Sequence, residues 1–404
     1  MRFGGFVVNL FWDSLPMFNF APLILRFRKQ LGRSLLLTLL APMLLAQESD
    51  PNHFRVLEVR GHSGTHLYTG EALKEVLQNG YGAAQVRYGW QSSDAGGWQS
   101  SYQYPIYGLG WYTAFIGDPE VLGTPGAFFG FVSFPLYQYR RHRMFLEPSL
   151  GLSYDFEPYN PETNVHNDAI GSRFNVYFAL NLGAAYRLNR EMDLVYGLDL
   201  THFSNGRTFR PNKGLNLAGL NLGFRYHFNK QQNLVDNRLH PETILPVRPN
   251  PQVFLKAEPL HVAEFLVYGA GGVVQNDEDK GTDKQYVTFS SFVEYRYHFN
   301  SKSAVVVGLD GFYDNSLRAS YPNKPHHFYG THLGYDYSFW LLSFRMQAGT
   351  YLHSRGHDYK GAYFFRPALQ LRPGKSWFVQ VGLKTQAGFK ADWVEYGLGL
   401  RLPR

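Results

Sequence analysis

The chain has 404 residues, of which 17% are aromatic and only 18% charged, with 41 glycines, a net charge of +7 and no cysteine. The lack of cysteine excludes a disulfide framework and a thiolate metal site, and the aromatic content excludes a disordered chain. No stretch beyond residue 46 reaches the ~20 consecutive apolar residues that a membrane-spanning helix needs. The composition therefore predicts an aromatic-rich β protein of one or two domains.

The N-terminal segment has its own charge pattern. Residues 1–46 carry a net charge of +4, because five arginines and lysines stand against Asp13, so the rest of the chain carries only +3. That remainder is too small to indicate a nucleic-acid partner. A basic cluster at 26–33 precedes an apolar run at 35–45, and polar residues follow Ala46. This order predicts a secretory signal peptide over residues 1–46.

The next part of the chain, from about residue 54, is a series of predicted strands. Runs of roughly ten residues alternate in polarity and are separated by turn clusters, a pattern typical of an outer-membrane β-barrel. One segment, 70–78, has the composition of a helix instead. The predicted strands lie near 54–62, 83–91, 106–116, 126–137, 142–155, 173–187, 192–204 and 215–228.

The segment 215–228 shows the alternation most clearly. Successive side chains of a strand point to opposite faces of the sheet. One face of this strand is apolar and ends in aromatics, and the other carries Gly, Asn, Arg and His. This predicts an antiparallel transmembrane β-barrel, all-β in class, with lipid outside and a polar lumen inside. A soluble β-sandwich is the alternative.

A proline-bearing stretch and a second series of strands complete the chain. We predict a first barrel unit over 47–229, a linker over 230–261, and a second strand series over 262–404. The motif at 224–229 recurs at 295–300, and the motif at 195–199 recurs at 306–310. The second series therefore resembles a diverged β repeat. It could form a separate barrel or complete one larger barrel, and the long connection favours separate units.

Candidate chemistry lies at the end of the predicted strand 192–204. His202 and Ser204 share the predicted lipid-facing row with Leu198 and Leu200. Residues two apart on one face of a strand are about 6–7 Å apart, close enough for their side chains to bond. A histidine beside a serine hydroxyl is the minimum for an activated nucleophile. The alternative is a solvated strand tip.

The residues that follow carry a family resemblance. The segment 202–216 reads His-Phe-Ser-Asn, then Pro-Asn-Lys-Gly, then Asn216 on the last strand. It resembles the signature of the lipid A 3-O-deacylase (PagL-like acyloxyacyl hydrolase) family, and the resemblance covers residues ~54–228. It implies an outer-membrane esterase with Ser204 as nucleophile and His202 as general base. The family's third catalytic residue is a Glu, whose position is held here by Asn216.

This departure bears on the predicted activity. An amide can orient an imidazole but cannot stabilise the imidazolium, and in a Ser-His-Asp triad the Asp→Asn change costs about 10⁴ in kcat. That corresponds to roughly 5 kcal/mol of barrier. The family pattern also makes Asn205 and Asn212 candidate oxyanion donors. The alternative is a structural role, because asparagine is common in tight turns.

The basic residues of the same loop are candidates for binding lipid phosphates. They are Arg207, Arg210 and Lys213. Aligning the repeated Gly-Leu-Asp motif puts Tyr313 at the position of His202 and Asn315 at that of Ser204. The second series therefore lacks the dyad, and we expect catalysis to be confined to the first.

The sequence thus predicts an outer-membrane ester hydrolase that removes a hydroxyacyl chain from lipid A in a Gram-negative bacterium. The alternatives are an inactive lipid-binding or scaffold barrel and, if all strands close one wide barrel, a small-solute channel. The expected partners are lipid A or lipopolysaccharide and outer-membrane lipid; association into a homodimer stays open. Neither a cofactor, a metal nor a nucleic acid is expected.

Overall fold

The structure is a computed structural model that describes residues 53–403, except 69, 93–96, 190, 229–258, 353–359 and 387–389. The predicted signal peptide and most of the predicted linker lie outside the described residues. Within these ranges, no helix combines the length and the apolar character needed to cross a membrane.

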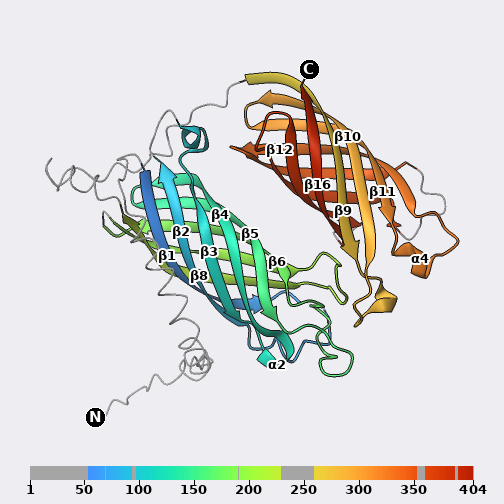
Figure 1. Ribbon diagram of the computed structural model, residues 1–404. Helices are drawn as coiled ribbons and strands as arrows, with labels where there is room; N and C mark the ends of the chain where they lie inside the picture. Colours follow the sequence, from blue (N-terminus) through green and yellow to red (C-terminus); the bar gives the residue numbers. More distant parts are fainter. Residues whose placement is uncertain are drawn as a thin grey trace, which may run out of the picture. The chain divides into compact units, whose positions relative to one another are not determined.

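The first barrel closes through antiparallel pairing of β1 with β8, in a register that runs from Arg55 opposite Phe228 to His66 opposite Leu217. Every predicted strand of the first series is present (Figure 1). Its strands are β1 (His53–His66), β2 (Tyr81–Ser92), β3 (Ile106–Phe115), β4 (Gly123–Tyr139), β5 (His142–Phe156), β6 (Asn175–Arg187), β7 (Met192–Ser204) and β8 (Leu215–Phe228).

The second series forms a closed eight-stranded barrel of its own, in which β16 pairs with β9. The strands therefore do not complete one wide barrel. The barrel begins at Pro259, inside the segment assigned to the linker. Its strands are β9 (Pro259–Val274), β10 (Tyr286–Asn300), β11 (Ser303–Asp314), β12 (His327–Phe339), β13 (Leu342–Tyr351), β14 (Tyr363–Leu371), β15 (Trp377–Gln386) and β16 (Ala391–Pro403).

Short helical turns lie in the connections of both barrels. They are η1 (Trp98–Tyr102), α2 (Pro119–Leu122), η2 (Asp277–Asp279) and α4 (Leu317–Ser320). Most of the longer loops lie at the end of each barrel where β1, β3, β5 and β7 of the first barrel and β9, β11 and β13 of the second end, whereas the β2–β3 connection, which contains η1, is a long loop at the opposite end. In outer-membrane barrels the long loops are extracellular.

The alternation along β8 follows the predicted pattern. Leu220 and Leu222 are 65% and 59% exposed on the outer wall, whereas Asn221 and Arg225 are buried in the lumen. The outer wall of a closed sheet with this pattern suits hydrocarbon, and the enclosed face holds the polar groups. The closed sheet also excludes the soluble sandwich, which would need two sheets packed face to face.

Charged side chains fill the interior of the first barrel. Arg60 donates to Glu147 at 3.0 Å, Arg87 donates to the same carboxylate, and Arg225 donates to Glu58 at 2.6 Å. An eight-stranded barrel is just wide enough for its interior to be filled by side chains. The ion pairs therefore occupy the space that a channel would need.

The second barrel has the same kind of interior with different residues. Arg366 donates to Asp310 at 2.8 Å, Arg345 donates to Glu294, and His332 lies 2.7 Å from Asp310. The channel prediction required one barrel wide enough to hold water. Two eight-stranded barrels, each filled by paired charges, do not meet that condition.

The predicted helix at 70–78 is wrong. Residues 71–79 form successive turns with isolated hydrogen bonds, such as Leu77 N–H to the Leu73 carbonyl at 3.0 Å. A segment this short does not offset the cost of helix nucleation by itself. Leu73 and Leu77 are both buried in the apolar cluster inside the barrel mouth. Their four-residue spacing reflects this packing, which a turn satisfies equally well.

The two repeated motifs fall on strands that are not equivalent. The described residues 224–228 of the first motif lie on the eighth strand of the first barrel, and its echo at 295–300 lies on the second strand of the other. The motif at 195–199 lies on the seventh strand, and its echo at 306–310 lies on the third. The second barrel therefore repeats the architecture of the first, whereas the motifs do not mark matching positions in it.

Candidate functional site

The candidate site begins at the outer wall of β7, near its long-loop end. Leu198 and Leu200 are 59% and 51% exposed on this wall, and they are followed on the same row by half-buried His202 and buried Ser204. Both side chains therefore follow the lipid-facing leucines, as the alternation predicts. The buried position of Ser204 differs from a freely solvated strand tip.

The pairing of β7 with β8 brings the third residue to the dyad. His202 lies directly opposite Asn216 across the ladder, and the imidazole Nδ1 is 2.7 Å from the amide Oδ1. With a proton on Nδ1 the imidazole donates to this oxygen, which leaves Nε2 as the basic nitrogen. Asn216 can therefore fix the tautomer and orientation of His202 without supplying a negative charge.

The Ser204 hydroxyl is held by the following loop, residues 205–214. Its Oγ accepts hydrogen bonds from Asn212 Nδ2 at 3.1 Å and from Gly206 N–H at 3.2 Å. Among the described hydrogen bonds none joins Ser204 to His202. In enzymes without substrate, catalytic hydrogen bonds are often long and tighten in the substrate complex.

The Pro-Asn-Lys-Gly motif has a structural explanation at two of its positions. Asn212 contacts Ser204 and also accepts from Asn205 N–H at 3.1 Å, so one amide organises the start of the loop. Gly214 has φ +75°, and a Cβ there would lie 2.9 Å from His202 Cε1. Glycine is required for both reasons, because other residues rarely adopt this φ and the imidazole occupies the space.

Two residues near Ser204 differ in their availability as oxyanion donors. The side chain of Asn205 donates to Ser172 Oγ at 2.9 Å and is therefore occupied in holding the loop to the β5–β6 connection. The backbone N–H of Gly206, which the sequence did not single out, points to Ser204 Oγ. Backbone donors carry no residue-type signal, so only the folded loop reveals this one.

The three basic residues of the loop have separate surroundings. Lys213 pairs with Asp168, yet 53% of its side chain is exposed. Burial and the neighbouring Asp168 carboxylate raise the pKa of Tyr68, whose protonated hydroxyl donates to the same carboxylate. Lys213 therefore stands at the rim of the site with about half of its side chain accessible.

Arg207 and Arg210 are less accessible. Arg210 lies 2.8 Å from Asp277, and Arg207 is buried with its guanidinium 3.1 Å from Asp392. Both carboxylates belong to the second barrel's sequence. A lipid phosphate would have to displace these contacts in order to bind either arginine.

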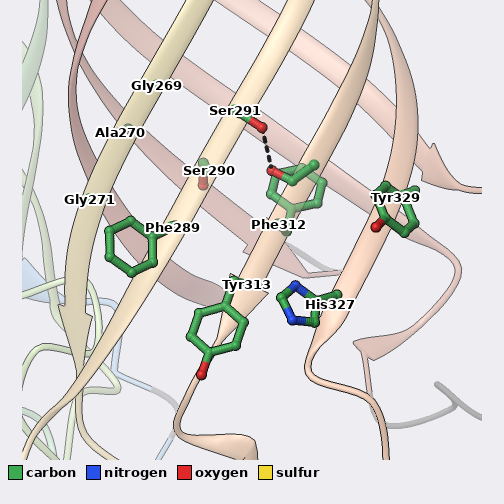
Figure 2. A pocket seen from close by; sticks show the side chains of 11 residues that line it. Gly269, Ala270, Gly271, Phe289, Ser290, Ser291, Phe312, Tyr313, His327 and Tyr329 are labelled. Atoms are coloured by element: carbon green, nitrogen blue, oxygen red, sulfur yellow. Dashed lines mark hydrogen bonds between the residues drawn. The ribbon is translucent and has the colours of Figure 1, made fainter.

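The outer wall of the second barrel carries a groove of about 590 Å³ between β9 and β12 (Figure 2). Phe289, Tyr313 and His327 lie along it, and Ser291 is its outward hydroxyl. The Ser291 hydroxyl donates to the Gly311 carbonyl at 3.4 Å. The hydroxyl of Ser291 is thus hydrogen-bonded to the backbone and not to the imidazole of His327.

The strand of the second barrel that is equivalent to β7 is β15, the seventh of its barrel. The outward row of β15 ends in Leu383 and Thr385. The Thr385 hydroxyl donates to the Phe365 carbonyl at 3.2 Å. The described end of β15 therefore has no histidine-serine pair. The positions that the motif alignment selects have none either, since they hold Tyr313 and Asn315.

Comparison with protein families finds two matches in this chain. The family model described as lipid A 3-O-deacylase (PagL) matches residues 82–225, which include the whole candidate site. A second model, described as acyloxyacyl hydrolase, C-terminal domain, matches residues 263–404. Together they cover most of both barrels.

Solved structures give weaker similarity, and no curated protein matches the chain. Neisserial surface protein A is 10% identical with a TM-score of 0.28, over 44% of this chain and 97% of that one. The Acinetobacter baumannii outer membrane protein Omp33 is 10% identical with a TM-score of 0.17, over 88% of this chain and 100% of that one.

Proposed function

The chain belongs to the lipid A 3-O-deacylase (PagL) family, and we propose that its first barrel removes an ester-linked acyl chain from lipid A. The family and the barrel fold support a location in the outer membrane. The candidate site is at the long-loop end of the barrel, on the wall that faces lipid. An ester bond of a membrane lipid can therefore reach Ser204 without leaving the bilayer surface.

The proposed reaction is nucleophilic acyl transfer followed by hydrolysis. Ser204 Oγ attacks the ester carbonyl while His202 Nε2 takes the hydroxyl proton. The tetrahedral intermediate collapses, and the sugar oxygen leaves with the proton that His202 returns. A water molecule, deprotonated by the same imidazole, then releases the acyl chain as a carboxylic acid and restores Ser204.

Two donors are available for the oxyanion of the tetrahedral intermediate. Asn212 Nδ2 and Gly206 N–H both lie within 3.2 Å of Ser204 Oγ. A modest shift of the acylated serine would let them donate to the adjacent carbonyl oxygen. Removing one donor of this kind typically costs about 10²–10³ in kcat.

Asn216 would hold His202 in its productive orientation, as its 2.7 Å contact with Nδ1 indicates. Without a carboxylate, the imidazolium formed during each transfer is less stabilised than in the family pattern. We therefore expect a slow hydrolase. Lys213 is the basic residue most able to contact a lipid phosphate, because more than half of its side chain is exposed.

The observation that supports this proposal best is the contact of His202 with Asn216 beside a buried Ser204. The test is mass spectrometry of lipid A from cells that express the wild type or Ser204→Ala. Loss of one acyl chain only in the presence of Ser204 is the expected result. Ser291→Ala, which removes a hydroxyl from the groove of the second barrel, is the matched control and should behave as the wild type.

A non-catalytic lipid-binding barrel is the second candidate. It is favoured by the uncharged Asn216 and by the bonds of Ser204 to Asn212 and Gly206 instead of His202. Identical lipid A spectra for the wild type and Ser204→Ala would support it and contradict the hydrolase.

A further inference from the structure

The loop that follows the nucleophile contacts the second barrel through several of its residues. A Cβ on Gly206 would lie 2.2 Å from Val394 Cγ2 and 3.6 Å from Leu383 Cδ1. Gly206 also has φ +64°, a conformation that favours glycine. The loop backbone therefore packs directly against the β15–β16 pair. This pair holds the same place in the second barrel as β7–β8, which carry the candidate site, hold in the first.

Arg207 anchors this contact. Its guanidinium donates to Asp392 Oδ1 at 3.1 Å and to Ser316 Oγ at 2.7 Å, and it lies 3.8 Å from Asp314. Both carboxylates are fully buried, and Arg207 itself is only 8% exposed. A planar guanidinium can bridge two acceptors at once, which a lysine ammonium on a flexible stem does less well.

The backbone of the loop is bonded to the β9–β10 connection, residues 275–285. Gln275 N–H donates to the Arg207 carbonyl at 2.9 Å, and Gln275 Oε1 accepts from Arg210 N–H at 2.6 Å. Gln285 Nε2 donates to the Thr208 carbonyl at 3.0 Å. The second barrel thus satisfies three main-chain groups of the segment 207–210, whereas the N–H groups of Thr208 and Phe209 donate to Asn205 within the loop.

This segment directly follows Gly206, whose N–H points to Ser204 Oγ. The first barrel holds the two ends of the loop, through Asn205 to Ser172 and through Gly214 N–H to the Ala169 carbonyl. The middle is bonded to Asn205 within the loop and, through the Arg207 and Thr208 carbonyls and the Arg210 N–H, to the second barrel. We infer that the second barrel is a docking partner for the catalytic loop, and that Arg207 is the positioning residue through which it orders the donors around Ser204.

This inference rests on the proposed function for its catalytic part, whereas docking itself does not. It gives the second barrel a role although that barrel lacks the dyad. The buried cluster of the second barrel also stays satisfied without Arg207. Asp392 accepts from Lys360 at 2.8 Å and from Lys384 at 2.6 Å. In Arg207→Ala the cluster keeps the carboxylates of Asp314 and Asp392 and the ammonium groups of Lys360 and Lys384. Its charges therefore still balance, and the barrel should fold.

Cross-linking of the full chain in its membrane tests docking without reference to activity. The chain has no cysteine, so Thr208→Cys with Gln285→Cys introduces one defined pair for a short bismaleimide. The linked peptides should be detected by mass spectrometry after proteolysis. Thr208→Cys with Ser301→Cys is the control, because Ser301 lies beyond the far end of β10, roughly 50 Å from Gln285 along the strand.

In the Arg207→Ala background we expect the cross-link to form about tenfold more slowly, as the loss of charge-assisted hydrogen bonds predicts. Arg207→Lys should recover part of the rate. No cross-link in the parent pair, or equal rates with and without Arg207, would overturn the docking role.

Kinetics tests the positioning role. Arg207→Ala should lower kcat about tenfold or more, part of the effect of losing an oxyanion donor, while KM stays near that of the wild type. Arg318→Ala removes a charge from the exposed face of α4 and should leave kcat unchanged. An unchanged kcat in Arg207→Ala, with activity still lost in Ser204→Ala, would overturn positioning.

If the wild type is as inactive as Ser204→Ala, the proposed function and the positioning role fail together, and cross-linking still decides docking.

Discussion

The two barrels share an architecture and an interior but differ at the end of one strand. Each closes eight antiparallel strands around paired charges, with aliphatic and aromatic side chains on the outer wall. In the first barrel the outer row of the seventh strand ends in His202 and Ser204, whereas in the second it ends in Leu383 and Thr385. The proposed catalysis therefore depends on a few residues at the rim of the first barrel and not on the barrel architecture, which both units share.

The difference also concerns what surrounds each strand end. The loop after β7 turns back over Ser204, supplies two donors to it and brings Gly214 against the imidazole. The strand pair β15–β16 instead offers Leu383 and Val394 to that loop. One barrel thus carries the candidate catalytic groups, and the corresponding face of the other is apolar and packs against the loop.

The largest expected difference between the barrels is the effect of removing a histidine. His202→Ala should lower the rate of lipid A deacylation about 10⁴-fold or more, since the general base is lost. His327→Ala, in the groove of the second barrel, should leave the rate unchanged. The measurement is release of fatty acid from purified lipopolysaccharide. Equal effects of the two changes would remove the distinction between the barrels.

The interiors should respond alike, which tests the common part of the comparison. Glu147→Ala removes the carboxylate that Arg60 and Arg87 share and leaves them with Glu58, and Glu294→Ala removes one of the two carboxylates of Arg345 and leaves Asp336. Breaking a buried pair by removing one partner costs about 3–5 kcal/mol. Urea unfolding in detergent should show a loss of up to this size for each variant, because the remaining carboxylates compensate part of the charge. A neutral result in one barrel would mean that its charges do not stabilise it.

A smaller effect is expected from the oxyanion donors. Asn212→Ala removes one hydrogen bond to Ser204 and should lower kcat about 10²–10³-fold with little change in KM. The matched change in the second barrel is Asn315→Ala, at the position that the motif alignment pairs with Ser204, and it should have no effect. A rise in KM alone would assign Asn212 to substrate binding instead.

The third catalytic position should show the smallest change, and in the favourable direction. Asn216→Glu restores the charge of the family pattern beside His202, so activity should be maintained or raised. The rate is compared with that of the wild type at equal protein levels in the membrane. A large loss of activity would show that the amide has a function that a carboxylate does not replace.

The sequence alone determined the class of the protein and most of the strands of its first barrel. Two-residue alternation is a local property, because it follows from the pleat of a single strand, so Leu220, Asn221 and Leu222 reveal their faces without any neighbour. The dyad was equally visible, since His202 and Ser204 lie on one strand and their common face follows from parity. A helix at 70–78 was wrongly expected because four-residue apolar spacing also suits a turn that packs into the barrel mouth.

Only the tertiary structure decided how many barrels form, since closure depends on pairing between β1 and β8 and between β9 and β16, far apart in the chain. It also decided which groups surround Ser204. The cross-strand register brings Asn216 to His202, and the Gly206 N–H is a backbone group that no residue type identifies. Arg207 looked like a phosphate ligand because its charge is local information, whereas its carboxylate partners, Asp392 and Asp314, are more than a hundred residues away.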